Sequence, residues 1–419
     1  MSKSLNVFLN ESQAGKLWVE KGQLAFQYDS DWLENDSAVP LSVSLPLQSE
    51  PQEGTDVSAY FSNLLPEADQ LIAVAKHFKV PLDDQFSLLK SVAGECAGAV
   101  SIVPDKRSTR SSASYRKLTG KTLGTTINAL KKQPLLAGKK GVRFSLAGTH
   151  TKLPIRFADE NQSLPLNGAL SDHIVKPPRD DCSDSIANEY FCMNLARRMD
   201  LEVPSVYLLT SATPLFVVNR YDRDMDDNGN IVKIHQEDFC QAMGIPPEKK
   251  HESDGGPSFK DCFDLVREYS VQPMVDLQRL LCWVVFNFFI GNEGIHAKNL
   301  AFLHTDKGPV LAPFYDLMST AVYPSLSYRL VMKIGGEDRP NWVIKRRWQQ
   351  FAKDIGMNYK VVHQCVMKMN KQLLPAAQQE AQAFQDKYGE CDVIDKILAL
   401  LETRCGKVKR RLSSDTTAK

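Results

Sequence analysis

The alternation of hydrophobic and polar positions predicts a small sheet at the start of the chain. In residues 1–45, hydrophobic residues alternate with polar ones in three short runs that turn residues separate. A period of two is typical of half-buried antiparallel strands. Residues 41–47 repeat the alternation and predict one more strand. The spacing becomes helical in residues 60–89, and residues 91–103 form a Gly- and Ala-rich segment that leads into a strand.

Residues 106–117 are the most loop-like stretch of the chain, because they are basic, rich in serine and without a hydrophobic period. We interpret them as the joint between two domains. A role in nucleic-acid binding is the alternative for such a charge cluster. The predicted domains are residues 1–118, an N-terminal α+β domain that includes this linker, and residues 119–419.

The second domain begins with strands and continues with helices. A strand that ends in Lys176 precedes a helix that has Ser185 as its expected N-cap and carries Glu189 in its first turns. A strand-rich lobe (about 119–233) followed by a helical lobe (about 234–419) is the order of a bilobal protein-kinase-like fold, so the fold class is α+β. The predicted strands cover residues 142–157 (two strands and a short loop), 172–176, 206–209 and 215–218, and the predicted helices cover residues 259–269, 274–290, 340–353, 357–372, 376–387 and 391–402.

The most informative stretch is a hydrophobic segment followed by a polar loop. Asn287 is the only polar residue in the segment 280–290, so we expect a helix that is buried on all sides and too short to span a bilayer. Glycines then end the helix, and several polar side chains arrive together. The loop contains Gly291, Gly294, His296, Lys298 and Asn299.

Beyond this loop, residues 300–314 predict a short hairpin whose second strand leads to Tyr315 and Asp316. The amide of Asn299 and the carboxylate of Asp316 are oxygen donors of the kind that Mg²⁺ prefers. Phosphotransferases hold magnesium with such a loop amide and strand-end carboxylate. The alternative is purely structural: a buried helix, a capped loop and a hairpin.

Two further features are typical of a site for nucleotide phosphates. Residues 147–150 form a turn of small residues whose backbone amides are able to face an anion, although one glycine makes a weak signal. Lys176 on its strand and Glu189 on the following helix match the ion pair by which kinases position ATP phosphates. The alternatives are an ordinary hairpin, an exposed lysine and a glutamate favoured near a helix start.

Composition and charge exclude some classes of protein. The hydrophobic fraction of 43% and the charged fraction of 24% are those of a soluble globular protein. Lys plus Arg (51) balances Asp plus Glu (50), so net charge favours no particular partner. The nine cysteines are dispersed without a CxxC pair, which favours reduced thiols in a cytoplasmic protein. We expect no signal peptide and no membrane span.

Taken together, these segments resemble the HipA family of bacterial serine/threonine kinase toxins. The resemblance covers nearly the whole chain, and the matching stretches follow in family order. They are FSNLLPEAD (61–69), SLAGTHTK (145–152), HIVKPP (173–178), NEYFC (188–192), NRYDR (219–223), IHQEDFCQAMG (234–244), GNEGIHAKN (291–299), PFYDLMST (313–320) and MKIGG (332–336).

The resemblance implies that the chain binds ATP and Mg²⁺ and that it carries a serine for autophosphorylation. The implied ATP-binding residues are Ala147, Gly148, Thr149, His150, Thr151, Lys152, Lys176, Glu189, Asn219, Arg220, Tyr221, His296, Asn299, Tyr315 and Asp316, of which residues 219–221 are the hinge that reads adenine. The implied metal ligands are Asn299 and Asp316, His296 and Lys298 flank the catalytic loop, and the autophosphorylated serine is Ser145.

The chain departs from the family pattern at two positions. His150 stands where the family usually has glutamine, which is a mild change. Gly294 stands where the family pattern G-N-x-D-x-H-x-K-N has the aspartate that acts as catalytic base. A positioned general base contributes roughly 10²–10⁴-fold to the rate, so this glycine should leave ATP and metal binding but remove most of the transfer. The neighbouring Glu293 points its side chain elsewhere along the loop.

The implied function is a kinase toxin that phosphorylates a translation-related protein, such as an aminoacyl-tRNA synthetase, and arrests growth. Its implied partner is a small dimeric helix-turn-helix antitoxin of the HipB kind, which bridges it to operator DNA. Basic residues are candidates for phosphate contacts there, with solvated charge as the alternative: Lys345, Arg346, Arg347 and residues 404–411. The alternative function is a catalytically inactive, ATP-binding scaffold and co-repressor on the antitoxin–DNA complex.

Overall fold

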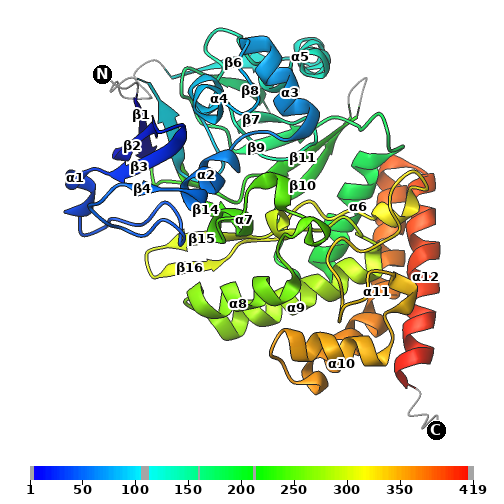
Figure 1. Cartoon of the computed structure of the whole chain (residues 1–419). Helices are drawn as coiled ribbons and strands as arrows, with labels where there is room; N and C mark the ends of the chain where they lie inside the picture. The colour runs from blue at the N-terminus through cyan, green and yellow to red at the C-terminus, as the bar shows by residue number, and fades with distance from the viewer. Residues whose placement is uncertain (1–3, 105–112, 159–160, 211–213, 414–419) are drawn as a thin grey trace. The chain divides into compact units, whose positions relative to one another are not determined.

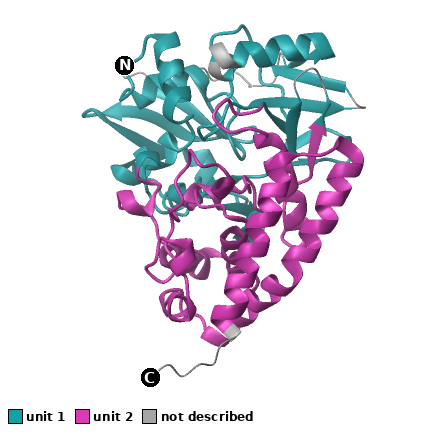
Figure 2. Ribbon diagram, turned by 90° about the vertical axis from the view of Figure 1, so that its right-hand side faces the viewer, with its two compact units in different colours: residues 1–177, 209–248, 301–312 teal, residues 178–208, 249–300, 313–419 magenta. Residues whose placement is uncertain are grey.

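The computed structural model describes residues 4–104, 113–158, 161–210 and 214–413 (Figure 1). The chain divides into two compact units, which Figure 2 colours separately. Unit 1 comprises residues 1–177, 209–248 and 301–312, and unit 2 comprises residues 178–208, 249–300 and 313–419. Each unit therefore combines segments that are distant in the sequence.

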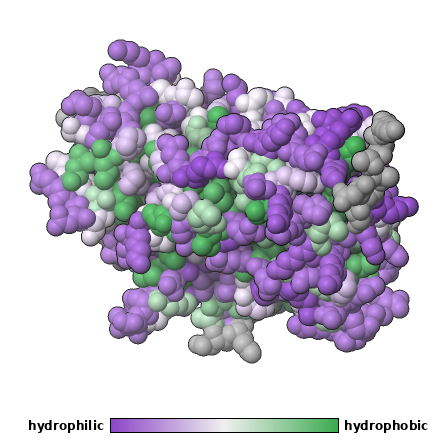
Figure 3. Space-filling view, turned by 90° about the horizontal axis from the view of Figure 1, so that it is seen from below, coloured by the Kyte–Doolittle hydropathy of each residue, from purple (hydrophilic) through white to green (hydrophobic). Residues whose placement is uncertain are grey.

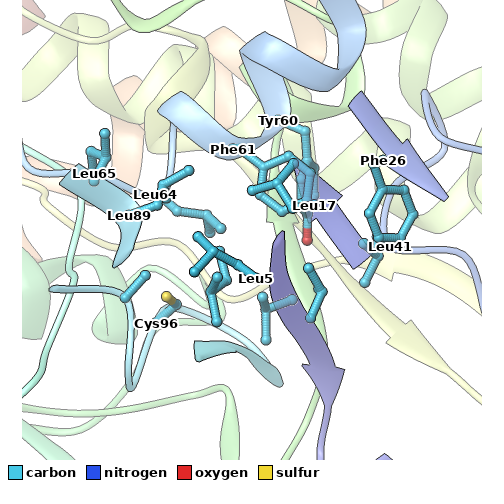
Figure 4. Close-up of a cluster of buried hydrophobic side chains, with 14 of the residues drawn as sticks. Leu5, Leu17, Phe26, Leu41, Tyr60, Phe61, Leu64, Leu65, Leu89 and Cys96 are labelled. Atoms are coloured by element: carbon cyan, nitrogen blue, oxygen red, sulfur yellow. The ribbon is translucent and has the colours of Figure 1, made fainter. Parts of the chain in front are cut away.

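Unit 1 begins with the predicted antiparallel sheet, in the strand order β4-β3-β2-β1-β5. Leu5 pairs with Leu17, and Leu17 pairs with Phe26, so these three side chains lie next to one another on one face. Tyr60 and Phe61 from α2 pack there in the buried cluster of Figure 4. The elements are β1 (Ser4–Leu9), β2 (Ser12–Glu20), β3 (Gln23–Tyr28), α1 (Ser30–Leu33), β4 (Gln52–Glu53), α2 (Thr55–Ser62), α3 (Ala68–Phe78), α4 (Gln85–Val92) and β5 (Val100–Val103).

The strand predicted at residues 41–47 is wrong. Only an isolated bridge joins Ser42 and Leu45. The buried hydroxyl of Tyr28 satisfies backbone groups there instead: it accepts from Leu41 N at 2.8 Å and donates to Leu45 O at 2.6 Å. Leu41 and Leu45 are buried, so the alternation was a sign of burial and not of pairing with another strand.

A second sheet of unit 1 contains β11, β9, β7, β8 and β6 in this order. Its β6 (Ser114–Leu118) overlaps the predicted linker, because these residues pair with β8 across the sheet. The rest of the linker, up to residue 112, lies outside the described residues. The other elements are α5 (Gly120–Lys132), the 3-10 turn η1 (Pro134–Leu136), β7 (Leu153–Ala158), β8 (Asn161–Leu166), β9 (His173–Lys176) and β11 (Leu215–Asn219). The first three residues of β10 (Val206–Leu209) belong to unit 2 and its last residue to unit 1.

The hairpin predicted for residues 142–157 is wrong in its first half. Residues 142–152 are not a strand beside β7, and their only sheet-like contact is an isolated parallel bridge between Glu95 and Phe144. The backbone of Glu95 takes the place of the expected partner, since it accepts from Ser145 N at 2.9 Å and donates to Arg143 O at 3.0 Å.

Unit 1 ends with two small antiparallel sheets. The first is the hairpin β12–β13. The second has the order β14-β15-β16 and includes the predicted hairpin after the polar loop, which is confirmed. Residues 236–238 form a strand, whereas we expected the helical half to begin there. The elements are β12 (Arg223–Met225), β13 (Ile231–Lys233), β14 (Gln236–Asp238), α7 (Phe239–Ala242), the 3-10 turn η2 (Pro247–Lys249), β15 (Ala301–Thr305) and β16 (Gly308–Leu311).

Unit 2 is mainly helical, and it contains the helices that were predicted between residues 259 and 402. Its longest helix, α11, joins the two helices predicted at 357–372 and 376–387, although Pro375 lies inside it. Leu373 and Ala377 on either side of this proline are fully buried, so packing outweighs the lost backbone hydrogen bond. The elements are α6 (Ser185–Arg198), η3 (Glu252–Asp254), α8 (Phe259–Tyr269), α9 (Pro273–Ile290), η4 (Ala297–Asn299), η5 (Thr320–Val322), η6 (Pro340–Trp342), α10 (Lys345–Asp354), α11 (Tyr359–Tyr388) and α12 (Asp392–Ser413).

Ser185 is not the N-cap of α6. The cap is Asp184, whose backbone is left-handed with φ of 52°. Ser185 is the first helical residue, and its hydroxyl accepts from Arg179 N at 2.9 Å. This contact holds the loop before the helix and uses the oxygen that a cap would need.

Helix α9 is the one helix of the described residues that is long and hydrophobic enough to cross a membrane by these two criteria. Its 18-residue window has a mean hydropathy of 1.3 and is 67% buried within the protein. The core helix of a soluble protein meets the same criteria, so this finding is weak evidence for a span. The face shown in Figure 3 is mostly hydrophilic, and hydrophobic residues are scattered over it.

Candidate functional site

The polar loop of unit 2 begins at the end of α9. Gly291 is its C-cap with φ of 72°, and a Cβ there would lie 2.7 Å from both Ala321 Cβ and Leu400 Cδ2. Only glycine therefore suits this position. Asn287, the polar residue of the hydrophobic segment, is buried and accepts from Asn292 Nδ2 at 2.8 Å. It ties the helix to the loop.

The structure brings together Asn299 and Asp316, the two predicted magnesium ligands. Asn299 Nδ2 donates to Asp316 Oδ2 over 3.3 Å, while its Oδ1 accepts from His296 N at 3.0 Å. Asp316 is exposed, and its φ of 60° lies in the left-handed region that few residues with a side chain adopt. Such strained backbone gathers at functional sites, where the surrounding structure holds it in place.

Asn299 and Asp316 both carry oxygen atoms of the kind that bind a magnesium ion. Mg²⁺ binds one or two protein carboxylates and takes its other oxygens from water and phosphate. Asp316 supplies an exposed carboxylate, but the amide nitrogen of Asn299 faces it, so direct ligation by Asn299 requires its amide to turn over. In the described part of the chain, no group of three or more His, Cys, Asp or Glu residues is placed to hold a metal.

The other predicted residues of the loop fix its shape. Tyr315 donates its hydroxyl proton to Lys298 O at 2.7 Å, which ties the segment before Asp316 to the loop. The His296 ring lies 5.4 Å from the His251 ring at an angle of 33°. Lys298 is buried. These contacts hold the chain on both sides of the Asn299–Asp316 pair.

Gly294, at the position of the family base, is exposed and has free space beside it. A Cβ there would have a single neighbour within 4 Å, Thr320 Cγ2 at 4.0 Å. Glu293 does not replace the missing carboxylate, because its own is 2% exposed and pairs with Arg404 on α12 at 2.5 Å. Burial raises the pKa of Glu293, and the charge of Arg404 opposes this shift.

Three residues that support this loop through hydrogen bonds were not identified from the sequence: Thr320, Asn188 and Ser319. Thr320 accepts from Glu293 N at 2.8 Å and donates to Gly291 O at 3.1 Å. Asn188 on α6 exchanges two hydrogen bonds with the backbone of Ser319, at 2.9 and 2.7 Å. All three lie in family-like stretches, at residues 188–192 and 313–320, where only Glu189, Tyr315 and Asp316 had a predicted role.

In unit 1, the predicted phosphate loop is held by residues 64–95 of the N-terminal module. Ser145 is 1% exposed, and its hydroxyl donates to Leu64 O at 2.5 Å. Further along, Gly148 O accepts from Glu67 N at 3.3 Å, and Thr151 Oγ1 accepts from Gln70 Nε2 at 3.1 Å. The loop is therefore anchored at three points along its length.

The loop also closes on itself. Lys152 Nζ donates to Ala147 O, and a Cβ on Gly148 would lie 2.9 Å from that nitrogen. Gly148 has φ of 107°, which favours glycine. The imidazole of His150 contacts Pro177 O at 2.9 Å through Nε2. Thr149 lies between Gly148 and His150, and it was predicted only as a member of this loop.

Lys176 ends β9 and is 8% exposed, and its ammonium lies 5.6 Å from the centre of the Phe216 ring. Glu189 is buried on α6 at 4% exposure. The first residue belongs to unit 1 and the second to unit 2. Their predicted ion pair stays a prediction.

The predicted hinge begins at Asn219, the last residue of β11. The guanidinium of Arg220 is 1% exposed and pairs with Asp222 at 2.7 Å and with Glu95 at 3.2 Å. Burial opposes the charge of Arg220, but these carboxylates outweigh it and raise the pKa. Tyr221 donates its hydroxyl proton to Gln236. Because the side chain of Arg220 is engaged by Asp222 and Glu95, we expect any contact of this residue with adenine to come from its backbone.

Sequence models of known families match most of the chain. The model described as the HipA N-terminal domain matches residues 5–103, and the model of the HipA-like C-terminal domain matches residues 144–377, more than half of the chain. The chain belongs to the HipA family. The resemblance inferred from the motifs is thereby confirmed.

Two named relatives align with most of the chain. "Putative kinase Y4mE" from Sinorhizobium fredii is 37% identical over 372 residues, which cover 87% of this chain and 89% of the relative. "Serine/threonine-protein kinase toxin HipA" from Shewanella oneidensis is 27% identical over 371 residues, with 84% of each chain covered. The chain is thus a member of a family of HipA-like toxin kinases.

A solved structure shows the same fold. It is a chain from the complex of Shewanella oneidensis MR-1 HipA, HipB and operator DNA, with a TM-score of 0.86 over 98% of both chains and 24% sequence identity. The predicted fold class, an α+β module followed by a bilobal fold with a helical C-terminal lobe, is confirmed by this match. The boundary predicted between the two domains stays a prediction.

Proposed function

We propose that this HipA-family chain binds ATP with Mg²⁺ and acts in a toxin–antitoxin module as a serine/threonine kinase whose transfer step is impaired. One observation carries the proposal. The Asn299–Asp316 pair is formed beside a loop whose base position is Gly294, and the one carboxylate within residues 291–299, that of Glu293, is paired with Arg404. The side chains proposed to bind Mg²⁺ are thus present, whereas the carboxylate that would accept the proton is absent.

Each unit would contribute to nucleotide binding in its own way. In unit 1, the amides of residues 147–152 and the charge of Lys176 suit phosphate oxygens, and the backbone of residues 219–221 suits adenine. In unit 2, Asn299 and Asp316 would hold Mg²⁺, which neutralises phosphate charge when bound. Glu189 would position Lys176, as the corresponding pair does in kinases.

The expected deficit lies in proton removal from the substrate hydroxyl. A base at position 294 would accept this proton, and glycine has no group that can. Glu293 is held by its ion pair and buried, so it does not reach a substrate from its present position. The absence of a positioned base slows transfer by roughly 10²–10⁴-fold, and residual transfer then relies on water.

Calorimetry of ATP binding with and without Mg²⁺ tests the site. The unmodified chain should bind ATP more tightly with Mg²⁺, and Asp316→Ala should remove this difference. Asp306→Ala is the matched control, because Asp306 is also exposed and lies in the turn of the β15–β16 hairpin. Equal ATP affinity with and without Mg²⁺ in the unmodified chain would show that Asp316 does not hold the metal.

The partner we propose is a dimeric helix-turn-helix antitoxin of the HipB kind, with operator DNA bound through it. The relative's complex contains HipB and operator DNA, and this supports the proposal. The substrate would be a translation-related protein such as an aminoacyl-tRNA synthetase. Of the basic candidates for DNA contact, Arg347 and Arg404 pair with Glu337 and Glu293. Lys407 and Arg411 donate to Asn341. The remaining candidates that are exposed are Arg346, Lys409 and Arg410.

The second candidate function is a scaffold without kinase activity that acts as co-repressor with the antitoxin. The engagement of Glu293 by Arg404 favours it, because no second carboxylate of the loop takes over the role of the base. A phosphorylation assay of the unmodified chain beside Gly294→Asp separates the two. Slow but measurable autophosphorylation supports the kinase, and none at all supports the scaffold.

A further inference from the structure

Two cysteines that are far apart in the sequence meet between neighbouring helices of unit 2. Cys282 on α9 and Cys365 on α11 are 83 residues apart, and their Sγ atoms lie 3.7 Å from each other. Cys282 is partly exposed and Cys365 is buried. The sequence contains no CxxC pair, so only the packing of α9 against α11 could reveal this dithiol.

The surroundings of Cys282 favour its thiolate. The S–H of Cys365 is placed to donate to it, Gln278 Nε2 donates at 3.6 Å, and the positive charge of Lys368 is close. These contacts outweigh burial and lower the pKa of Cys282 to about 7. The same hydrogen bond, together with burial, raises the pKa of Cys365. Near neutral pH, Cys282 is therefore the nucleophilic thiolate, and Cys365 stays protonated.

We propose that Cys282 and Cys365 are a redox-sensitive dithiol that hydrogen peroxide converts into an intramolecular disulfide. The partly exposed Cys282 thiolate attacks peroxide, forming an S–O bond while the O–O bond breaks and hydroxide leaves to become water. Cys365 then attacks the sulfenic sulfur, forming the S–S bond while the S–O bond breaks and a second water leaves. Both thiols lose their protons, and two electrons pass to the peroxide, which is reduced to two waters.

The second step becomes easier once the first has occurred. The pKa of Cys365 is raised first by its hydrogen bond to the Cys282 thiolate and also by the charge of that thiolate. Formation of the neutral sulfenic acid removes both influences, so Cys365 then ionises more readily. The sulfur atoms are already in contact, and closure requires only a short movement of the two side chains.

The disulfide would link the helix that precedes the catalytic loop to the longest helix of unit 2. It would close a loop of 83 residues, which restricts the unfolded chain strongly. We therefore expect the oxidised chain to unfold at a temperature several degrees higher than the reduced chain. Helix α9 ends at Ile290, and the polar loop begins at the next residue, so the cross-link would tie down the helix from which that loop starts.

Peptide mapping after limited peroxide treatment tests the proposal in the full chain. A peptide pair joined through Cys282 and Cys365 should be the main product, and a thiol reductant should reverse it. Cys391 is the matched control, because it is also partly exposed but burial raises its pKa. Overoxidised Cys282 without the cross-link, or equal oxidation of Cys282 and Cys391, would overturn the proposal.

Two variants separate the chemistry from a general change in folding. Cys365→Ala removes the S–H donor, so alkylation of Cys282 by iodoacetamide at neutral pH should slow several-fold while Cys391 reacts as before. Cys282→Ser should abolish both the cross-link and the rise in melting temperature on oxidation. A rise in melting temperature that persists in Cys282→Ser, or alkylation of Cys282 that is unchanged in Cys365→Ala, would show that the pair does not act as a unit.

Discussion

The structure has space for a side chain at position 294, and the backbone conformation there is one that residues other than glycine adopt. A Cβ there would approach only Thr320 Cγ2, at 4.0 Å, and Gly294 is not among the glycines with positive φ. Nothing in the local structure therefore requires glycine, in contrast to Gly291, where a Cβ would collide with two side chains. The missing carboxylate is a chemical difference from the family pattern and not a consequence of the fold.

Restoring this carboxylate should restore transfer. We expect Gly294→Asp to raise autophosphorylation by roughly two to four orders of magnitude, because it returns a positioned general base to the loop. ATP affinity should stay within a few-fold, since the Asn299–Asp316 pair is untouched. Rates from radiolabelled ATP, with affinity from calorimetry, measure the two effects separately.

Glu293→Gln in the original chain is the control for this experiment. It removes the charge and keeps the shape, so it should leave the residual rate unchanged if Glu293 only pairs with Arg404. A large loss of rate in Glu293→Gln would mean that Glu293 acts as the base despite its burial.

Ser145 offers a second test at the scale of one residue. Its buried hydroxyl donates to Leu64 O, so a carboxylate there would face a carbonyl oxygen and break this anchor of the predicted phosphate loop. We expect Ser145→Asp to weaken ATP binding at least tenfold in calorimetry. Ser145→Ala loses one hydrogen bond, worth about 1 kcal/mol, and should bind ATP within a few-fold of the unmodified chain.

The control for the added charge is Ser37→Asp, because Ser37 is exposed on a loop of the same unit. It should leave ATP affinity unchanged. Equal affinities for Ser145→Asp and Ser37→Asp would mean that residues 145–152 do not bind the phosphates.

At the scale of elements, α12 supports the polar loop through the buried ion pair between Arg404 and Glu293. Arg404 donates to Phe288 O at the end of α9 and to Glu293 in the loop, with its side chain 11% exposed. Arg404→Met should lower the free energy of unfolding by roughly 3–5 kcal/mol, because it leaves a buried carboxylate without its partner. Urea unfolding followed by circular dichroism measures this loss.

The pH dependence of this loss has a definite sign. Burial already raises the pKa of Glu293, and removing Arg404 takes away the influence that lowers it. A carboxyl whose pKa is higher in the folded state costs stability above its unfolded pKa, and the cost disappears as acid protonates it. The deficit of Arg404→Met should therefore shrink as the pH falls. A deficit that is constant with pH would point to lost packing of the arginine stem.

Elements with a strong hydrophobic period were predicted well from the sequence, and contacts between distant segments were not. Helix α9 and the β15–β16 hairpin lie where the pattern placed them. The pattern at 41–47 and 142–146 reports burial, but the backbone partners there are a tyrosine hydroxyl and Glu95. Such partners leave no trace in local spacing.

In the candidate site too, local features could be predicted from the sequence, and contacts between distant segments could not. Asn299 and Asp316 could be predicted because the loop and the hairpin that join them are local. Arg404, 111 residues from Glu293, and Asn188, 131 residues from Ser319, could not, since only the packing of helices brings them to the loop. The motif stretches marked Asn188 and Ser319 as part of the pattern, but they did not show what these residues hold.

At the scale of the whole molecule, the boundaries of the family domains and of the compact units do not coincide. Residues 5–103 match one domain model and residues 144–377 match another, yet unit 1 contains parts of both. Leu64, Glu67 and Gln70 from the first anchor the loop of the second. Residues 5–103 therefore help to hold the predicted phosphate loop in place.

The last prediction concerns growth of cells that express the chain. If transfer is impaired only at Gly294, the unmodified chain should be tolerated without its antitoxin, whereas Gly294→Asp should arrest growth unless the antitoxin is supplied. Gly294→Asp combined with Asp316→Ala restores the base but removes the metal ligand, so it should be harmless at the same expression level. Colony counts with and without antitoxin measure the outcome. Arrest by the doubly substituted chain would mean that toxicity comes from binding a partner, because that variant lacks the group that would hold Mg²⁺ for transfer.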